Sequence, residues 1–258
     1  MSSTTKVIAA VFAALLVVAA AVVLWLLFAA DEPGPEGPVA VTTPLPEPSP
    51  TPTLAERLSA RLAGTTLQTS DAVVRELVGQ LSARPALTKW LAHEDLVRRF
   101  VAAVDNVGNG VSPTTQLTFM RPEEPFKVVQ RGDRFFIDPA SYDRYDLPTQ
   151  VFLSLDTEGT AALYRELEPL VDEAYREISP PGSSFADRVE AAIDHLLEVV
   201  PPAEPPQVER KVVTWVYVDE SLENLSDAQK QLLRMGPENA LLIKAKLREL
   251  KAELSANS

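Results

Sequence analysis

The sequence contains no cysteine and only two histidines among its 258 residues. Without cysteine the chain cannot form disulfides, cannot carry the acyl group of a lipoprotein and lacks the nucleophile of Cys-His enzymes. The two histidines, His93 and His195, are too few for zinc sites of the usual Cys and His kind. We therefore predict a fold that rests on its hydrophobic core, with no metal site and no cofactor.

Sequence motifs of known chemistry are missing as well. The chain has no Gly-x-Ser-x-Gly elbow, no P-loop and no dinucleotide-binding fingerprint. Its one Ser-x-x-Lys motif, Ser3 to Lys6, lies beside a long apolar run and far from any predicted pocket. No residue is therefore assigned a catalytic role.

Basic residues are also outnumbered by acidic ones, and the formal net charge is −12. Most of the negative charge belongs to the stretch from Leu54 to Leu225, whereas the tail from Ser226 onward is mildly basic. An acidic surface is repelled by phosphate backbones. The composition therefore argues against nucleic-acid binding.

The longest apolar run extends from Val7 to Ala30 and carries no charged side chain. At about 1.5 Å per residue, a helix of this length crosses a hydrocarbon core about 30 Å thick. Lys6 precedes the run, and the next basic residue is Arg57, so residues 1–6 are predicted to be cytoplasmic. We expect a single-pass signal-anchor in the inner membrane, with the C-terminal domain in the periplasm.

Two alternatives concern the same run. A cleaved signal peptide normally has an apolar region of about 7–15 residues, and this run is longer. Self-association of the span is the other alternative, because Ala9, Ala10, Ala13 and Ala14 would allow two helices to approach closely.

Residues 31–53 form a proline-rich linker between the anchor and residues 54–258, the predicted helical extracytoplasmic domain. Closely spaced prolines favour an extended, semi-rigid spacer of about 3 Å per residue. The linker is expected to be a plain tether, with a docking motif for a proline-binding partner as the alternative.

Helical periodicity dominates the domain. The pattern predicts helices that begin at Ser70, after His93 and at Ser184, and a long helix from Asp156 to Ile178 with a kink at Pro169. Asp138 followed by Pro139 resembles a helix start. We therefore predict a mainly α fold, a multi-helix domain with a small antiparallel β-sheet, preceded by one transmembrane helix.

Three segments are predicted as strands: Phe126–Gln130, Arg134–Ile137 and Lys211–Val218. Arg131-Gly132-Asp133 suits a hairpin loop in which glycine takes a positive φ. The same triplet is an adhesion motif elsewhere, but turn chemistry accounts for it here.

Acidic residues on the long predicted helix provide one candidate binding surface. Glu166, Glu173 and Glu177 project onto one face, which is either a solvated surface or a docking site for a basic partner. A Ca²⁺ site is less suited to this face because that ion takes oxygens converging from a loop. His93 is expected to have a capping or first-turn role, and His195 to be a surface or edge residue rather than a general base.

The C-terminal segment provides the second candidate surface. Ser226 is predicted to cap a short helix that ends at Gly236, and Pro237 starts another with an apolar line through Ile243, Leu247, Leu250 and Leu254. The candidate partner-binding basic residues are Lys230, Arg234, Lys244 and Lys246. We expect the apolar line to pack on the domain and the basic residues to stay exposed.

Four strings carry a family resemblance: Glu94–Asn106, Ile137–Asp146, Ala192–Leu197 and Gln229–Asn239. They resemble an uncharacterised bacterial family of singly membrane-anchored envelope proteins, over about Ser70 to Leu250. The resemblance implies a bacterial envelope location and one continuous domain. It supplies no activity or catalytic residue.

The sequence thus favours a non-catalytic interaction or scaffolding protein of the cell envelope, whose partner is an envelope protein or a cell-wall polymer. The alternative is an enzyme that acts on cell-wall material through carboxylates such as Glu173.

Overall fold

The computed structural model describes residues 52–256, which form ten α-helices and four β-strands. The helices are α1 (Leu54–Leu62), α2 (Ser70–Gly79), α3 (Pro85–Trp90), α4 (Leu96–Gly108), α5 (Asp146–Leu153), α6 (Thr157–Arg176), α7 (Phe185–Leu197), α8 (Glu220–Glu223), α9 (Asp227–Arg234) and α10 (Pro237–Ala256). The strands are β1 (Val128–Arg131), β2 (Arg134–Ile137), β3 (Gln207–Lys211) and β4 (Thr214–Tyr217). Short 3₁₀ helices lie at Leu67–Thr69, Pro113–Thr115, Thr118–Met120, Pro139–Ser141 and Asp143–Tyr145.

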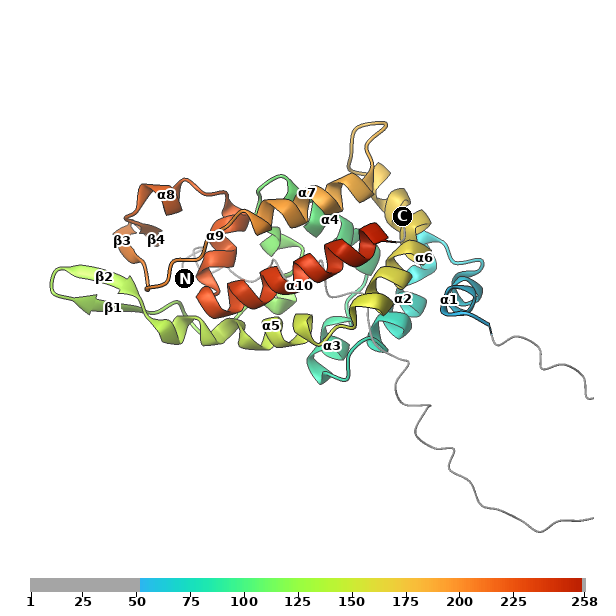
Figure 1. Ribbon diagram of the computed structural model, residues 1–258, viewed down its shortest axis with the longest axis horizontal. Helices are drawn as coiled ribbons and strands as arrows, with labels where there is room; N and C mark the ends of the chain where they lie inside the picture. The colour runs from blue at the N-terminus through green and yellow to red at the C-terminus, as the bar shows by residue number, and fades with distance from the viewer. Residues whose placement is uncertain (1–51, 257–258) are drawn as a thin grey trace, which may run out of the picture.

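The helices form an elongated body with the sheet at one end of its long axis and α1 at the other (Figure 1). In this body α4 packs against α6 and α7, and α10 packs against α5, α6 and α7. One continuous apolar core joins them and includes Phe152 and Phe185, which have no exposed surface. The prediction of a mainly helical domain with a small antiparallel sheet is confirmed for the described residues.

Three helices begin where the sequence predicted, each after a capping side chain. Asp156, Ser184 and Ser226 each accept a hydrogen bond from a backbone N–H of the first turn that follows. Asp138 does the same, although it begins a 3₁₀ turn rather than an α-helix. Gly236, at φ +91°, separates α9 from α10 as predicted.

The sheet has the order β1-β2-β3-β4, and all neighbours are antiparallel. One strand prediction is wrong: Lys211–Val218 is not a single strand, because the chain reverses at Val212 and Val213 and pairs Lys211 with Thr214. The valine-rich run contains no residue typical of a turn, so its sequence gave no sign of the reversal.

The predicted cytoplasmic residues 1–6, the anchor 7–30 and nearly all of the linker lie outside the described residues. Among residues 52–256, no helix is both long enough and apolar enough to cross a membrane. The domain assignments therefore stay predictions.

Candidate interaction surface

The predicted C-terminal helix pair, α9 and α10, forms and packs its apolar line inward: Ile243, Leu247 and Leu250 are almost fully buried. The expectation that the basic residues stay exposed is wrong for two of them. Lys244 is 6% exposed and Lys246 is 7% exposed. Neither residue contributes a free cation to a partner surface.

Both buried lysines bind backbone carbonyls just beyond the end of a helix. The Lys244 ammonium donates to the carbonyl of Val199, two residues after α7, and Lys246 donates to the carbonyl of Leu155, two residues after α5. Such carbonyls have no partner within their own helix, so an ammonium group satisfies them. Burial lowers the pKa of Lys244. These lysines join α10 to the ends of two other helices.

The remaining basic candidates are also engaged within the domain. Lys230 donates to the Glu223 carbonyl at 3.1 Å and pairs with the carboxylates of Glu223 and Asp227, each at 3.5 Å. The Arg234 guanidinium lies 5.9 Å from the centre of the Tyr217 ring. These four basic candidates therefore do not form the open basic face that was expected of them.

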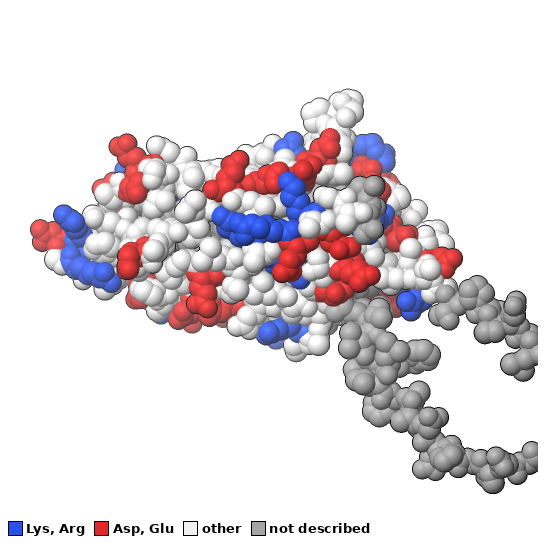
Figure 2. Space-filling model, viewed as in Figure 1, with Lys and Arg blue, Asp and Glu red and all other residues white. Residues whose placement is uncertain are grey.

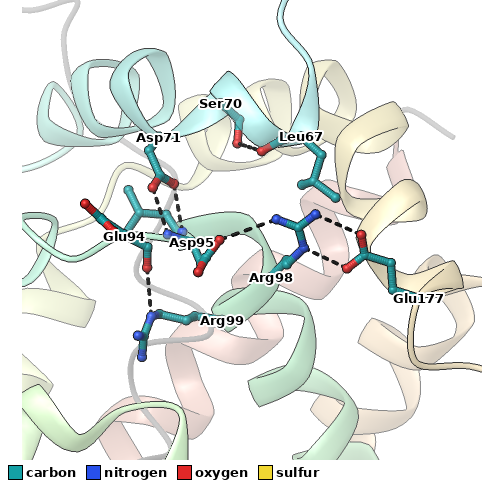
Figure 3. Close-up of polar contacts among 9 residues, drawn as sticks. Leu67, Ser70, Asp71, Glu94, Asp95, Arg98, Arg99 and Glu177 are labelled. Atoms are coloured by element: carbon teal, nitrogen blue, oxygen red, sulfur yellow. Dashed lines mark hydrogen bonds and ion pairs between the residues drawn. The ribbon is translucent and has the colours of Figure 1, made fainter.

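Two of the three acidic candidates, Glu166 of α6 and Glu177 at its C-cap, contact another helix. Glu177 binds Arg98 of α4 through two hydrogen bonds of 2.7 and 2.8 Å (Figure 3), and this pairing lowers the pKa of Glu177. Glu166 accepts a hydrogen bond of 2.8 Å from Ser59 of α1. Glu173 is half-buried. The row therefore serves partly to hold α1 and α4 against α6.

The start of α4 is capped from another helix. The Asp71 carboxylate of α2 accepts hydrogen bonds from the backbone N–H groups of Asp95 at 2.7 Å and Leu96 at 2.9 Å (Figure 3). Asp95 has φ +58° and does not cap the helix with its own side chain. The predicted capping role of His93 is wrong, because its ring instead stacks on Phe119 at 4.3 Å between ring centres.

His195 and Ser226 form the contact that most resembles catalytic chemistry. The Nε2 atom of His195 lies 2.7 Å from the Ser226 hydroxyl, which suits a serine and its base. A catalytic histidine also needs a third group that orients it, and Glu198 is not placed to do so. Its carboxylate oxygen is 3.9 Å from Nδ1 of His195, beyond hydrogen-bond distance, and the Glu198 side chain is 71% exposed. Ser226 also accepts from the Gln229 N–H as the cap of α9. The contact is therefore structural.

A hollow of about 360 Å³ lies between α6, α7 and the end of α10. Its lining carries both signs of charge, with Arg165 and Lys251 beside Glu168, Asp187 and Glu190. Lys251 bridges to Asp194 at 2.6 Å and to Glu190 at 3.1 Å, and these contacts raise its pKa. Because these charges neutralise one another, the hollow has no charge of one sign that would select a ligand.

A different surface lies where the two hairpins turn. In the antiparallel order, β1-β2 and β3-β4 reverse at the same end of the sheet, and we define residues 131–134 and 209–214 as the sheet tip. All ten residues are exposed. Four are basic and two are acidic, in a chain of net charge −12. Within the described part of the chain, no ion pair involves the basic four: Arg131, Arg134, Arg210 and Lys211.

Aliphatic side chains also project from the sheet tip. Val212 is 90% exposed and Val213 is 57% exposed. Val212 has φ +48°, a backbone conformation that is unfavourable for a β-branched residue. Sequence reasoning missed this turn because both valines lie in a strand-like run.

The face of the sheet that points away from the core continues this surface. Val129, Phe136 and Val216 alternate with the core-facing residues and are only half-buried. The Arg131 guanidinium lies 5.1 Å from the centre of the Phe136 ring. Figure 2 shows basic side chains with an acidic group beside them at this end of the molecule, and side chains of both signs along the helical body.

Comparisons with known proteins place the chain but give it no activity. Within residues 52–256 no group of His, Asp or Glu side chains is arranged to hold a metal ion. A search of curated proteins and a search of solved structures each found no match. The profile of one protein family matches residues 96–251, from the first residue of α4 into α10 and more than half of the chain. The chain therefore belongs to the family described as "Protein of unknown function (DUF3014)".

Proposed function

We propose that this protein is a non-catalytic interaction module of the bacterial cell envelope and that the sheet tip is its contact surface. Residues 7–30 anchor it in the inner membrane, residues 1–6 are cytoplasmic and the domain lies in the periplasm. The observation that carries the proposal is the exposure of all ten sheet-tip residues, four of them basic without an ion pair inside residues 52–256.

The contrast with the other candidate surfaces supports this choice. Three basic candidates of the helix pair, Lys230, Lys244 and Lys246, bind other parts of the domain. The acidic groups Glu166 and Glu177 do so as well. Apolar side chains that lie together on a surface with a polar rim mark contact surfaces, and Val212 and Val213 lie together beside unpaired basic residues. The sheet tip combines both features.

The position of the sheet tip fits a tethered module. The described chain begins beside α1, at the end of the long axis opposite the sheet (Figure 1). If residues 31–53 form the extended spacer that their prolines predict, the sheet tip is the part of the domain that reaches farthest from the anchor. A partner at a distance from the anchoring point would be met by this end.

The alternative of a cell-wall enzyme has less support. Glu173 was its candidate acid or base. Its neighbours, Glu166 of α6 and Glu177 at the C-cap of α6, are each bonded to another helix. A carboxylate pair on this face would have to give up those contacts before it acted on a substrate.

Cysteine protection tests the proposal, since the natural chain has no competing cysteine. The full chain carries a single cysteine at the sheet tip, Val213→Cys, or on the helical body, Val200→Cys, a position that is 79% exposed. Cells with a permeabilised outer membrane and the purified protein are treated with a membrane-impermeant maleimide. We expect slower labelling in cells at position 213 and equal labelling in both samples at position 200.

Two results would contradict the proposal. Equal labelling of position 213 in cells and in the purified protein would remove the sheet tip as a contact surface. Labelling of neither position until the inner membrane is opened would place the domain on the cytoplasmic side.

A further inference from the structure

We infer that the sheet tip binds an anionic lipid surface, an inference that rests on the proposed role of the sheet tip as the contact surface. The first argument is the distribution of charge. The sheet tip has four basic and two acidic residues and so a positive net charge, whereas the chain as a whole has a net charge of −12 (Figure 2). A negatively charged bilayer attracts the sheet tip and repels the body, so the field orients the domain with its tip toward the lipid.

The second argument is a pair of like charges. Arg131 and Arg134 are direct partners across the β1-β2 hairpin, where two positive side chains on the same face destabilise the pairing. A phosphate group between them would accept hydrogen bonds from both guanidinium groups and remove the repulsion. The arrangement therefore fits a phosphate-bearing headgroup.

The third argument is the pair of exposed valines. Val212 and Val213 occupy a convex two-residue turn, which suits insertion into a soft surface. The boundary between headgroups and acyl chains accepts aliphatic side chains while phosphates meet the adjacent basic groups. A soluble polyanion would use only the cations, and the valines would gain nothing from it. Both features together favour a bilayer.

The acidic members of the sheet tip limit the strength of this binding. Asp133 and Glu209 lie within it, so its net charge is lower than the count of basic residues suggests. Binding should therefore be reversible and should weaken as salt screens the charges.

The test uses the full chain in nanodiscs of neutral phosphatidylcholine, with a polarity-sensitive dye on Val213→Cys. Vesicles of phosphatidylcholine alone, or of phosphatidylcholine and phosphatidylglycerol in equal parts, are then added. We expect the dye emission to rise and shift to the blue only with the anionic vesicles, and to revert at high salt. A dye on Val200→Cys is the matched control and should respond to neither vesicle.

Two further variants separate charge from insertion. Changing Arg131 and Arg134 together to Gln should weaken vesicle binding by about tenfold or more, because each basic group near an anionic surface contributes several-fold. Val212→Ser should reduce the dye response while the salt dependence remains. Circular dichroism and melting of each variant show that the fold is retained.

A dye that responds equally to neutral and anionic vesicles, or to neither, would overturn the inference. If position 213 is nevertheless protected in cells, the sheet tip keeps its role as a contact surface, and its partner is a protein or polymer. If position 213 is unprotected as well, both the inference and the proposed function are wrong.

Discussion

The two hairpins of the sheet share one backbone geometry but differ in chemistry. Each has a two-residue turn whose first residue has positive φ: Gly132 at +62° and Val212 at +48°. Gly132 suits that conformation, because it has no Cβ. Val212 does not, since a β-branched side chain at positive φ is strained. The same turn is thus relaxed in one hairpin and strained in the other.

This difference means that stability does not account for a valine at position 212. Glycine would fit its backbone, as the neighbouring hairpin demonstrates, and 90% exposure leaves little packing to lose. Local rules that are broken without a compensating contact are expected at functional positions. The comparison therefore supports the sheet tip as the contact surface.

The largest effect is expected where the sheet meets the core. Ile137 of β2 has no exposed surface, so Ile137→Ala should lower the free energy of unfolding by about 3 kcal/mol. Chemical denaturation followed by circular dichroism measures this change. A loss below about 1 kcal/mol would mean that the hairpins are not held by the core, and that their turns cannot be compared as parts of one rigid sheet.

Transferring the strain to the relaxed hairpin should have the next largest effect. Gly132→Val puts a β-branched residue at φ +62°, and nothing lies within 4 Å of the added Cβ, so the cost is in the backbone. We expect a loss of about 1–3 kcal/mol in the free energy of unfolding. Gly132→Ala is the control and should cost less. An unchanged stability would show that positive φ carries no strain in these turns.

Relieving the strain should have a smaller and opposite effect. Val212→Gly should raise the free energy of unfolding by about 1 kcal/mol, because the relief exceeds the extra chain entropy of glycine. The same variant should weaken the response to anionic vesicles. Thermal melting and the vesicle assay together test this, and a variant that is stabilised yet fully active would separate the strain from binding.

Local features of the fold could be predicted because their causes lie within a few residues. Asp156, Ser184 and Ser226 cap helices whose first turns follow at once. The apolar line of α10 repeats at helical spacing, so its burial was also predictable. The hairpin at Gly132 contains its own turn signal.

The features that were missed depend on residues far away in the sequence. The carbonyls that bury Lys244 and Lys246 are 45 and 91 positions away, respectively. The carboxylate that caps α4 comes from Asp71, 24 positions before Asp95. The reversal at Val212 appears only when β3 pairs with both β2 and β4. Long-range contacts determine these features, and they also determine which charged side chains are paired within the domain.

The smallest effect is expected at the surface ion pair of Arg98 on α4 and Glu177 at the C-cap of α6, away from the sheet. The pairing lowers the pKa of Glu177, so its ionised form adds stability above the ordinary value of 4.5, and this stability is lost as the pH decreases through the lowered value. Glu177→Gln should therefore melt slightly below the natural protein at neutral pH, and the two melting temperatures should converge in acid. Vesicle binding should be unchanged at neutral pH. Stronger binding by this variant, which carries one negative charge fewer, would mean that surface charge anywhere on the domain, rather than the sheet tip, controls the contact. The distinction between the two hairpins would then lose its functional meaning.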